Sequence, residues 1–251
     1  MLASRMSKVS ISPTTQLNAR VAQLKAEGKD IIKLNIGEPD KSTFDYIRVA
    51  GIKAIADGFT KYTVGSGIPE LRRAISEKLE RENGLHCPID QITVTVGGKQ
   101  AVFASIMSLV EEGDEVLLPV PCWVSYTDMI KLAGGTPVFV ETKEAEGYAL
   151  DLDAIRQAVS PRTKAIVICT PNNPTGAVYS YEDLKALGEL ACEHGFYIIA
   201  DEIYEKLVYD GVEHISIASI SPEIFARTIT INGFSKAYAM TGWRGGYAAA
   251  P

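Results

Sequence analysis

The sequence predicts an α/β protein of three layers, an α/β/α arrangement built on a mostly parallel sheet of seven strands. Strand-like and helix-like segments alternate from about residue 92 onward, which is the pattern of repeated crossover units. A mostly parallel sheet of this kind is covered by helices on both faces. Polar motifs follow three of the apolar runs, and in such sheets ligands bind beyond the carboxyl ends of the strands.

The elements before residue 92 are expected to be helices and loops. Helices are predicted at about 16–28, 47–57 and 70–83. A loop, 35–40, follows the short apolar stretch 31–34, and a glycine-rich loop spans 62–69.

From residue 92 the elements alternate. Strands are expected at 92–96, 115–119, 137–141, 165–169, 197–200, 228–231 and 246–250. Helices are expected between them at 100–111, 124–133, 152–159 and 182–194. In the last of these, Leu184, Leu187 and Ala191 recur at helical spacing, so one face of that helix is expected to be buried.

Composition excludes several classes of function. Hydrophobic residues make up 46% of the 251 residues, so a sizeable core is expected, and the net charge of -6 argues against nucleic acid as a partner. No apolar stretch is long enough for a membrane span, and the N-terminus has no apolar segment typical of a secretory signal. The four cysteines form no CxxC pair, which favours free thiols in the cytoplasm. The three histidines have no metal-ligand spacing, and no metal site is expected.

Lys236 lies in the most informative segment of the chain. It follows the apolar run 228–231, which reads as a buried strand, and Arg244 comes eight residues later. Lysine is the side chain that condenses with an aldehyde, and arginine grips a phosphate with two parallel hydrogen bonds. A lysine with a phosphate clamp is what pyridoxal phosphate requires of a protein.

Two further strand ends carry matching groups. The run 164–169 is followed by Pro171-Asn172-Asn173-Pro174-Thr175-Gly176, and the run 196–200 by Asp201-Glu202-Ile203-Tyr204. Together with the Lys236 segment, these motifs resemble the class I aminotransferases, whose architecture is fold type I of the pyridoxal-phosphate enzymes. The resemblance runs from about Ser12 to the last residue.

The resemblance implies a role for each cofactor residue. Lys236 would form the aldimine with pyridoxal phosphate, Asp201 would hold the ring nitrogen protonated, and Asn173 and Tyr204 would donate to the phenolic oxygen. Trp123 would stack on the ring. The phosphate would be bound by Ser235, Arg244 and the backbone amides of Gly98 and Lys99 at a helix start, with Tyr62 reaching the phosphate of the partner subunit in a homodimer.

The substrate residues implied by the resemblance are fewer. Gly37 matches a loop glycine that closes over the substrate. Ser12, Thr14 and Lys99 match side chains that hold the distal carboxylate of aspartate or glutamate. Trp123 and Asn173 match residues that also border the substrate. The family's arginine for the α-carboxylate has no counterpart in this sequence.

Each of these residues also has a purely structural interpretation. Asp201 would be a helix cap or a surface acid, Asn173 a turn residue, and Ser12 and Thr14 the start of a helix. The aromatic residues Tyr62, Trp123 and Tyr204 would simply be packed in the fold. An isolated lysine near an arginine would be surface charge.

The function expected from this resemblance is transfer of an amino group from an amino acid of the aspartate or glutamate type to a 2-oxo acid. Residues 1–45 are expected to be the N-terminal segment of an incomplete small domain and 46–251 the large cofactor-binding domain, with the C-terminal small domain absent. Two alternatives stay open. One is a lyase or synthase with the same cofactor residues, and the other is a catalytically impaired fragment that binds pyridoxal phosphate.

Overall fold

One sheet of seven strands forms the centre of the protein. A computed structural model describes residues 3–9 and 13–251, and it arranges the strands in the order β1-β7-β6-β5-β4-β2-β3. The strands are β1 Ile92–Val96, β2 Glu115–Val120, β3 Thr136–Glu141, β4 Thr163–Cys169, β5 Tyr197–Asp201, β6 Thr228–Gly233 and β7 Gly245–Ala249. The pairs from β3 to β6 are parallel, but β7 runs antiparallel to both β1 and β6. The predicted seven-stranded, mostly parallel sheet is confirmed, and the reversal of β7 is an addition to it.

All seven helices expected from the sequence are present. They are α1 Pro13–Ala26, α2 Asp45–Ala56, α3 Pro69–Asn83, α4 Gly98–Leu109, α5 Ser125–Leu132, α6 Leu152–Ala158 and α7 Tyr181–His194, followed by a short α8, Pro222–Phe225. Short 3-10 turns are η1 Ser4–Lys8, η2 Ile89–Gln91, η3 Glu144–Glu146, η4 Ile217–Ser219 and η5 Thr241–Trp243. Within residues 3–9 and 13–251, no helix is both long and apolar enough to span a membrane.

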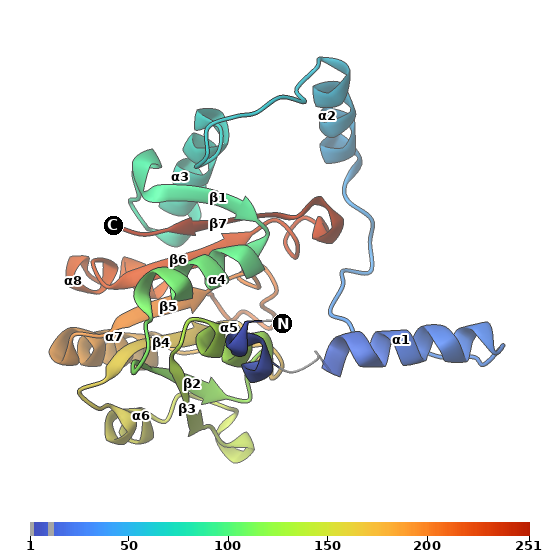
Figure 1. The fold of residues 1–251 in the computed structure, drawn as a ribbon. Coiled ribbons are helices and arrows are strands. Elements are labelled where there is room, and N and C mark those ends of the chain that lie inside the picture. The colour runs from blue at the N-terminus through green and yellow to red at the C-terminus, as the bar shows by residue number, and fades with distance from the viewer. Residues whose placement is uncertain (1–2, 10–12) are drawn as a thin grey trace.

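Side chains that alternate along each strand separate the two faces of the sheet. On β4, Ile166 and Ile168 pack against α6, α7 and α8, whereas Ala165 and Val167 pack against α4 and α5. Helix α3 covers the same face of the sheet as α6, α7 and α8, and it packs over β1 and β7 through Ile75 and Leu79. The result is the three-layer arrangement that the sequence predicts (Figure 1).

The N-terminal elements lie outside these layers. In Figure 1, α1 and α2 stand clear of the sheet and are joined by an extended chain. No residue of α2 is buried. Between the two helices, residues 35–43 form an extended segment, here called the strap, that runs past the loop after β6. Thr43 fastens the strap: its Oγ1 donates to the Ala239 carbonyl (2.5 Å) and accepts from Trp243 Nε1 (3.0 Å).

Candidate active site

The sheet topology brings the sequence-predicted residues to one edge. Cys169 at the end of β4 lies opposite Asp201 at the end of β5, so polar residues that follow the two strands emerge side by side. Ser235 and Lys236 follow β6, the next strand. The chain then turns back into β7, and because β7 is antiparallel, Arg244 returns to this same edge immediately before that strand. The seven residues between Lys236 and Arg244 are therefore a loop at the sheet edge.

These residues line a common cavity of about 480 Å³. Ten of the predicted site residues border it, and they come from seven different segments of the chain. They are Gly37, Gly98, Lys99, Trp123, Asn173, Asp201, Tyr204, Ser235 and Lys236; Arg244 completes the set.

Asp201 is a buried carboxylate with a fixed orientation. Tyr126 Oη donates to its Oδ2 (2.7 Å), and the backbone N–H of Ile203 donates to its Oδ1 (3.2 Å). Burial raises the pKa of the Asp201 carboxyl to about 6, although both hydrogen bonds oppose that rise. A cation bound against this carboxylate would relieve the cost of its burial, so the site favours a protonated base as partner.

Asn173 and Tyr204 form a donor pair beside Asp201. Asn173 Nδ2 donates to Tyr204 Oη over 3.2 Å, which holds the phenol at the cavity wall. Burial raises the pKa of Tyr204 to about 12, so its hydroxyl keeps its proton at neutral pH and can donate it to an oxygen in the cavity.

Lys236 presents its amine to the cavity close to Tyr204. Its Nζ lies 5.6 Å from the centre of the Tyr204 ring and donates to the carbonyl oxygen of Gly37 in the strap. Burial lowers the pKa of the amine, Glu38 raises it, and the positive charge of Arg244 lowers it again. The net decrease makes the free amine more available as a nucleophile and a base.

One end of the cavity is suited to an anion. Gly98 and Lys99 begin α4, where backbone N–H groups have no acceptor within the helix. Ser235 is buried on the next wall, and the Arg244 guanidinium donates to the Thr241 carbonyl (2.8 Å). Close backbone packing places these groups: a β-carbon on Gly97 would collide with the Arg244 guanidinium, and one on Gly246 would collide with the Gly97–Gly98 peptide. Glycine is therefore required at both positions.

Trp123 forms the wall opposite β6. Its ring meets Tyr126 edge to face, with centroids 5.3 Å apart, and Lys99 Nζ lies 4.9 Å from its centre. Tyr126 thus contacts both Asp201 and Trp123.

Two predicted residues have side chains that the structure does not describe, and a third, Tyr62, lies away from the cavity. Ser12 lies outside the described residues, and of Thr14 only the helical backbone is described. Tyr62 lies in the loop between α2 and α3, fully exposed, and does not border the cavity. The role expected of Tyr62, at the phosphate of a partner subunit, stays a prediction.

Sequence reasoning missed several groups at the site. Tyr126 is the most consequential, and the signal for it was its position one helical turn after Trp123, at the start of the predicted helix. Glu38 and Thr241 were also missed; Thr241 Oγ1 donates to Glu38 Oε1 (2.8 Å) across the mouth of the cavity. Their pairing joins segments 203 positions apart, so no local pattern indicates it.

The known proteins to which this chain is similar are named as aminotransferases. Residues 29–251 match the family model for aminotransferase class I and II. The chain is 48% identical to the aspartate/prephenate aminotransferase of Thermus thermophilus and to the aspartate aminotransferase of Geobacillus stearothermophilus, each over all of this chain and 64% of the relative. Among solved structures, aspartate aminotransferase from Thermus thermophilus with maleate matches it with a TM-score of 0.96 and 47% identity, over 100% of this chain and 65% of that one. The chain therefore spans about two thirds of the length of these relatives.

Proposed function

The chain belongs to the aminotransferase class I and II family, and from that premise we propose that it binds pyridoxal phosphate and transfers an amino group between an amino acid of the aspartate or glutamate type and a 2-oxo acid. One observation carries this proposal. Lys236, Asp201, Asn173 with Tyr204, and the anion site at α4 and Arg244 converge on a single cavity, although they come from strand ends far apart in the sequence.

The residues present fit the cofactor in their chemistry. Asp201 is a buried acceptor for a protonated ring nitrogen, and Tyr204 and Asn173 are donors for a phenolic oxygen. Ser235, Arg244 and the first amides of α4 are the donors for a phosphate. Pyridoxal phosphate, when bound, supplies an electron sink for negative charge at the substrate α-carbon.

Lys236 is proposed as the residue that moves the proton at the substrate α-carbon. Its lowered pKa leaves more of the amine neutral than in an ordinary lysine, so that it can accept that proton and return it. Two contacts would orient the amine: Nζ lies 5.6 Å from the centre of the Tyr204 ring, and it donates to the Gly37 carbonyl in the strap. The strap would also restrict the access of water to the amine.

The substrate class is a finer part of the proposal. Lys99 places a cation above Trp123 at the cavity wall, where it would attract a carboxylate. The relatives bear the name aspartate aminotransferase, and one was solved with maleate, a four-carbon dicarboxylate. Gly37, Ser12 and Thr14 are proposed, from the resemblance, to complete the substrate side.

Domain division and assembly belong to the same proposal. Residues 1–45 would be part of a small domain and 46–251 the large domain, in keeping with the position of α1 and the strap outside the sheet. A homodimer is proposed because α2 exposes Val49, Ile52 and Ile55, and Tyr62 is free to reach a partner's phosphate.

The test is reconstitution with pyridoxal phosphate, followed by an amino acid. The chain is expected to show a visible absorption band, and borohydride reduction followed by peptide mass spectrometry is expected to find the cofactor on Lys236. Addition of aspartate or glutamate is expected to convert the cofactor to pyridoxamine phosphate with release of a 2-oxo acid.

Two lysines of the same cavity make a matched pair for this test. Lys236→Ala is expected to abolish the band, whereas Lys99→Ala, which leaves the backbone amide in place, is expected to retain it. Reduction onto any lysine other than Lys236 would refute the assignment, and release of ammonia in place of pyridoxamine phosphate would mean elimination chemistry.

A further inference from the structure

A second group of buried polar side chains lies behind the active site. Glu202, the residue after Asp201, is fully buried and does not border the active-site cavity. Ser216 Oγ donates to its Oε1 (2.8 Å), but its Oε2 has no hydrogen-bond partner among the described residues. The His214 side chain is 6% exposed, and within the same described part of the chain neither of its ring nitrogens is hydrogen-bonded. His214 Nε2 and Glu202 Oε2 lie 3.2 Å apart, at ion-pair distance, but form no hydrogen bond with each other, so both atoms could serve as ligands.

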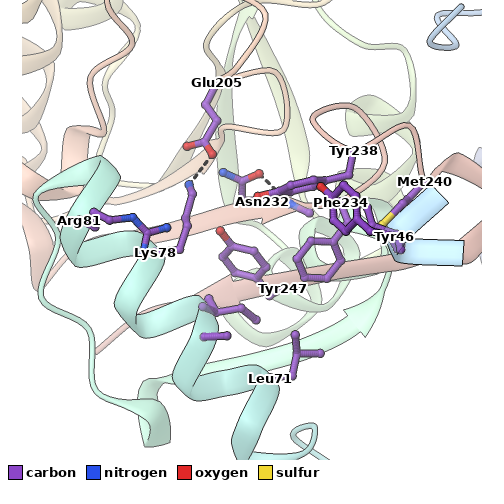
Figure 2. Close-up of a pocket in the computed structure, with 14 residues that line it drawn as sticks. Tyr46, Leu71, Lys78, Arg81, Glu205, Asn232, Phe234, Tyr238, Met240 and Tyr247 are labelled. Atoms are coloured by element: carbon purple, nitrogen blue, oxygen red, sulfur yellow. Dashed lines mark hydrogen bonds and ion pairs between the residues drawn. The ribbon is translucent and has the colours of Figure 1, made fainter. Parts of the chain in front are cut away.

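Glu205 brings a second carboxylate to the same place. Its Oε1 accepts from Lys78 Nζ and its Oε2 from Asn83 Nδ2 (2.8 Å), both residues of α3. One ligand atom from each of Glu202, Glu205 and His214 lies within 4.8 Å of the others. Figure 2 shows Glu205 and Lys78 meeting at the wall of a separate cavity of about 460 Å³, between α3 and the β6–β7 region.

We propose that Glu202, Glu205 and His214 form a binding site for a divalent transition-metal ion, with Zn²⁺ as the ion to test. Imidazole nitrogen and carboxylate oxygen are ordinary zinc ligands at about 2.0–2.2 Å, which sets ligands of a tetrahedral ion about 3.4 Å apart. His214 Nε2 and Glu202 Oε2 are 3.2 Å apart and already have this spacing. A rotation of the Glu205 side chain brings the third ligand into range.

Charge at the cluster favours a cation. Glu205 is paired with Lys78 and is also close to Lys206, which is itself paired with Glu82. Glu202 has no lysine or arginine partner among the described residues, so with a neutral imidazole its negative charge is uncompensated in a buried place. Ser216, Lys78 and Asn83 then act as the outer partners that orient ligating carboxylates in protein metal sites. The cavity beside Glu205 would give an ion access to that carboxylate.

The ion would act as a structural clamp. Glu202 directly follows β5, His214 belongs to the loop after it, and Glu205 is tied to α3 through Lys78 and Asn83. Joining these three segments fixes the strand end that carries Asp201. This assigns a site that the spacing of the histidines did not indicate, because only folding brings His214 back to Glu202.

The experiment uses the 251-residue chain treated with a chelator and then titrated with Zn²⁺ by calorimetry, with Co²⁺ as a spectroscopic probe. One equivalent is expected to bind with a micromolar or lower dissociation constant and to raise the melting temperature. Bound Co²⁺ is expected to show visible bands of nitrogen and oxygen ligation without a thiolate charge-transfer band. His214→Ala is expected to weaken binding at least tenfold, since losing even an outer partner has that effect.

A second histidine supplies the matched control. His194 also lies beside a glutamate, with Nε2 3.8 Å from Glu193 Oε1, but at the surface, so His194→Ala is expected to leave zinc binding unchanged. Glu202→Gln is the second variant if His214→Ala does not fold, because it can still accept from Ser216. Absence of stoichiometric binding by the unmodified chain would overturn the proposal. Equal binding by the His214 or Glu202 variants would overturn it as well and would identify the buried pair as a plain ion pair.

Discussion

Helices α2 and α3 are consecutive in the chain and similar in length, yet they differ completely in packing. In α3, Ile75 and Leu79 are buried against β1 and β7. In α2, Val49, Ile52 and Ile55 recur along one side of the helix and remain 63%, 67% and 70% exposed. Apolar periodicity therefore predicts a helix in both places but not whether the helix has a surface to cover. A cluster of exposed apolar side chains on one helix face often marks a site of association with another protein surface.

The first prediction compares one core residue with one exposed residue. Leu79→Ala is expected to lower the free energy of unfolding by about 2–5 kcal/mol, because it leaves a cavity beneath α3. In the monomer, where its side chain is exposed, Ile52→Ala is expected to change it by less than about 0.5 kcal/mol. Urea unfolding measures both. An equal loss for Ile52→Ala, growing with protein concentration, would show that α2 is covered by a second copy.

The second prediction concerns a charge that the packed region buries. The folded chain holds the Asp201 proton more tightly than the unfolded chain does, so ionisation of this group costs stability as pH rises through about 4 to 6. In the cofactor-free chain, Asp201→Asn is therefore expected to be more stable than the unmodified chain by about 2–3 kcal/mol at pH 8, with no advantage near pH 4.

Asp151 gives the control of opposite sign. It caps α6, and the Ala154 N–H lowers its pKa. Asp151→Asn is therefore expected to lose stability above about pH 4, where the native carboxylate is ionised. Thermal unfolding across this pH range checks both variants, and parallel curves for Asp201→Asn and the unmodified chain would contradict the burial of a raised-pKa acid.

The third prediction tests the strap, which lies between the packed and unpacked regions. Thr43→Val removes both hydrogen bonds of the Thr43 hydroxyl, at a cost of about 1 kcal/mol. Acrylamide quenching of Trp243 fluorescence is expected to increase, while the unfolding midpoint of the sheet changes little. Thr60→Val, in the exposed loop after α2, is the control and should change neither measurement.

The smallest effect is expected at Tyr62. Because this side chain is fully exposed, Tyr62→Phe should alter stability by less than about 0.5 kcal/mol. If the proposed homodimer forms, the same change should weaken pyridoxal-phosphate affinity measurably, because it removes a donor for the partner's phosphate. Equilibrium dialysis measures this affinity, and an unchanged dissociation constant for Tyr62→Phe would show that Tyr62 does not contact the cofactor.

Much of the sheet was predictable from sequence because its strands are local apolar patterns. The carboxyl-edge placement of Asn173, Asp201 and Lys236 followed from the parallel order alone. The direction of β7 was not predictable, because the apolar pattern of a short strand such as Gly245–Ala249 does not distinguish parallel from antiparallel pairing. It matters because the reversal returns Arg244 to the site.

Contacts between distant segments were the other limit of sequence reasoning. The Tyr126–Asp201 hydrogen bond spans 75 positions, and the Lys236–Gly37 bond spans 199. Both hydrogen bonds form only when the folded chain brings distant segments together: the first joins α5 to the end of β5, and the second joins the strap to the loop after β6. Single residues within a motif were therefore identified, while their orienting partners required the structure.

The place of β1 at the end of the sheet has a consequence for how the chain folds. In the described structure β1 is hydrogen-bonded to one strand alone, β7, the seventh strand in chain order. Ile92 pairs with Ala249, 157 positions later in the sequence, and contacts of such high sequence separation form slowly. A nascent chain would thus assemble the parallel strands first and leave β1 with α3 unprotected. Pulse-labelling of newly made chains should find residues 69–96 the last to gain protection from proteolysis.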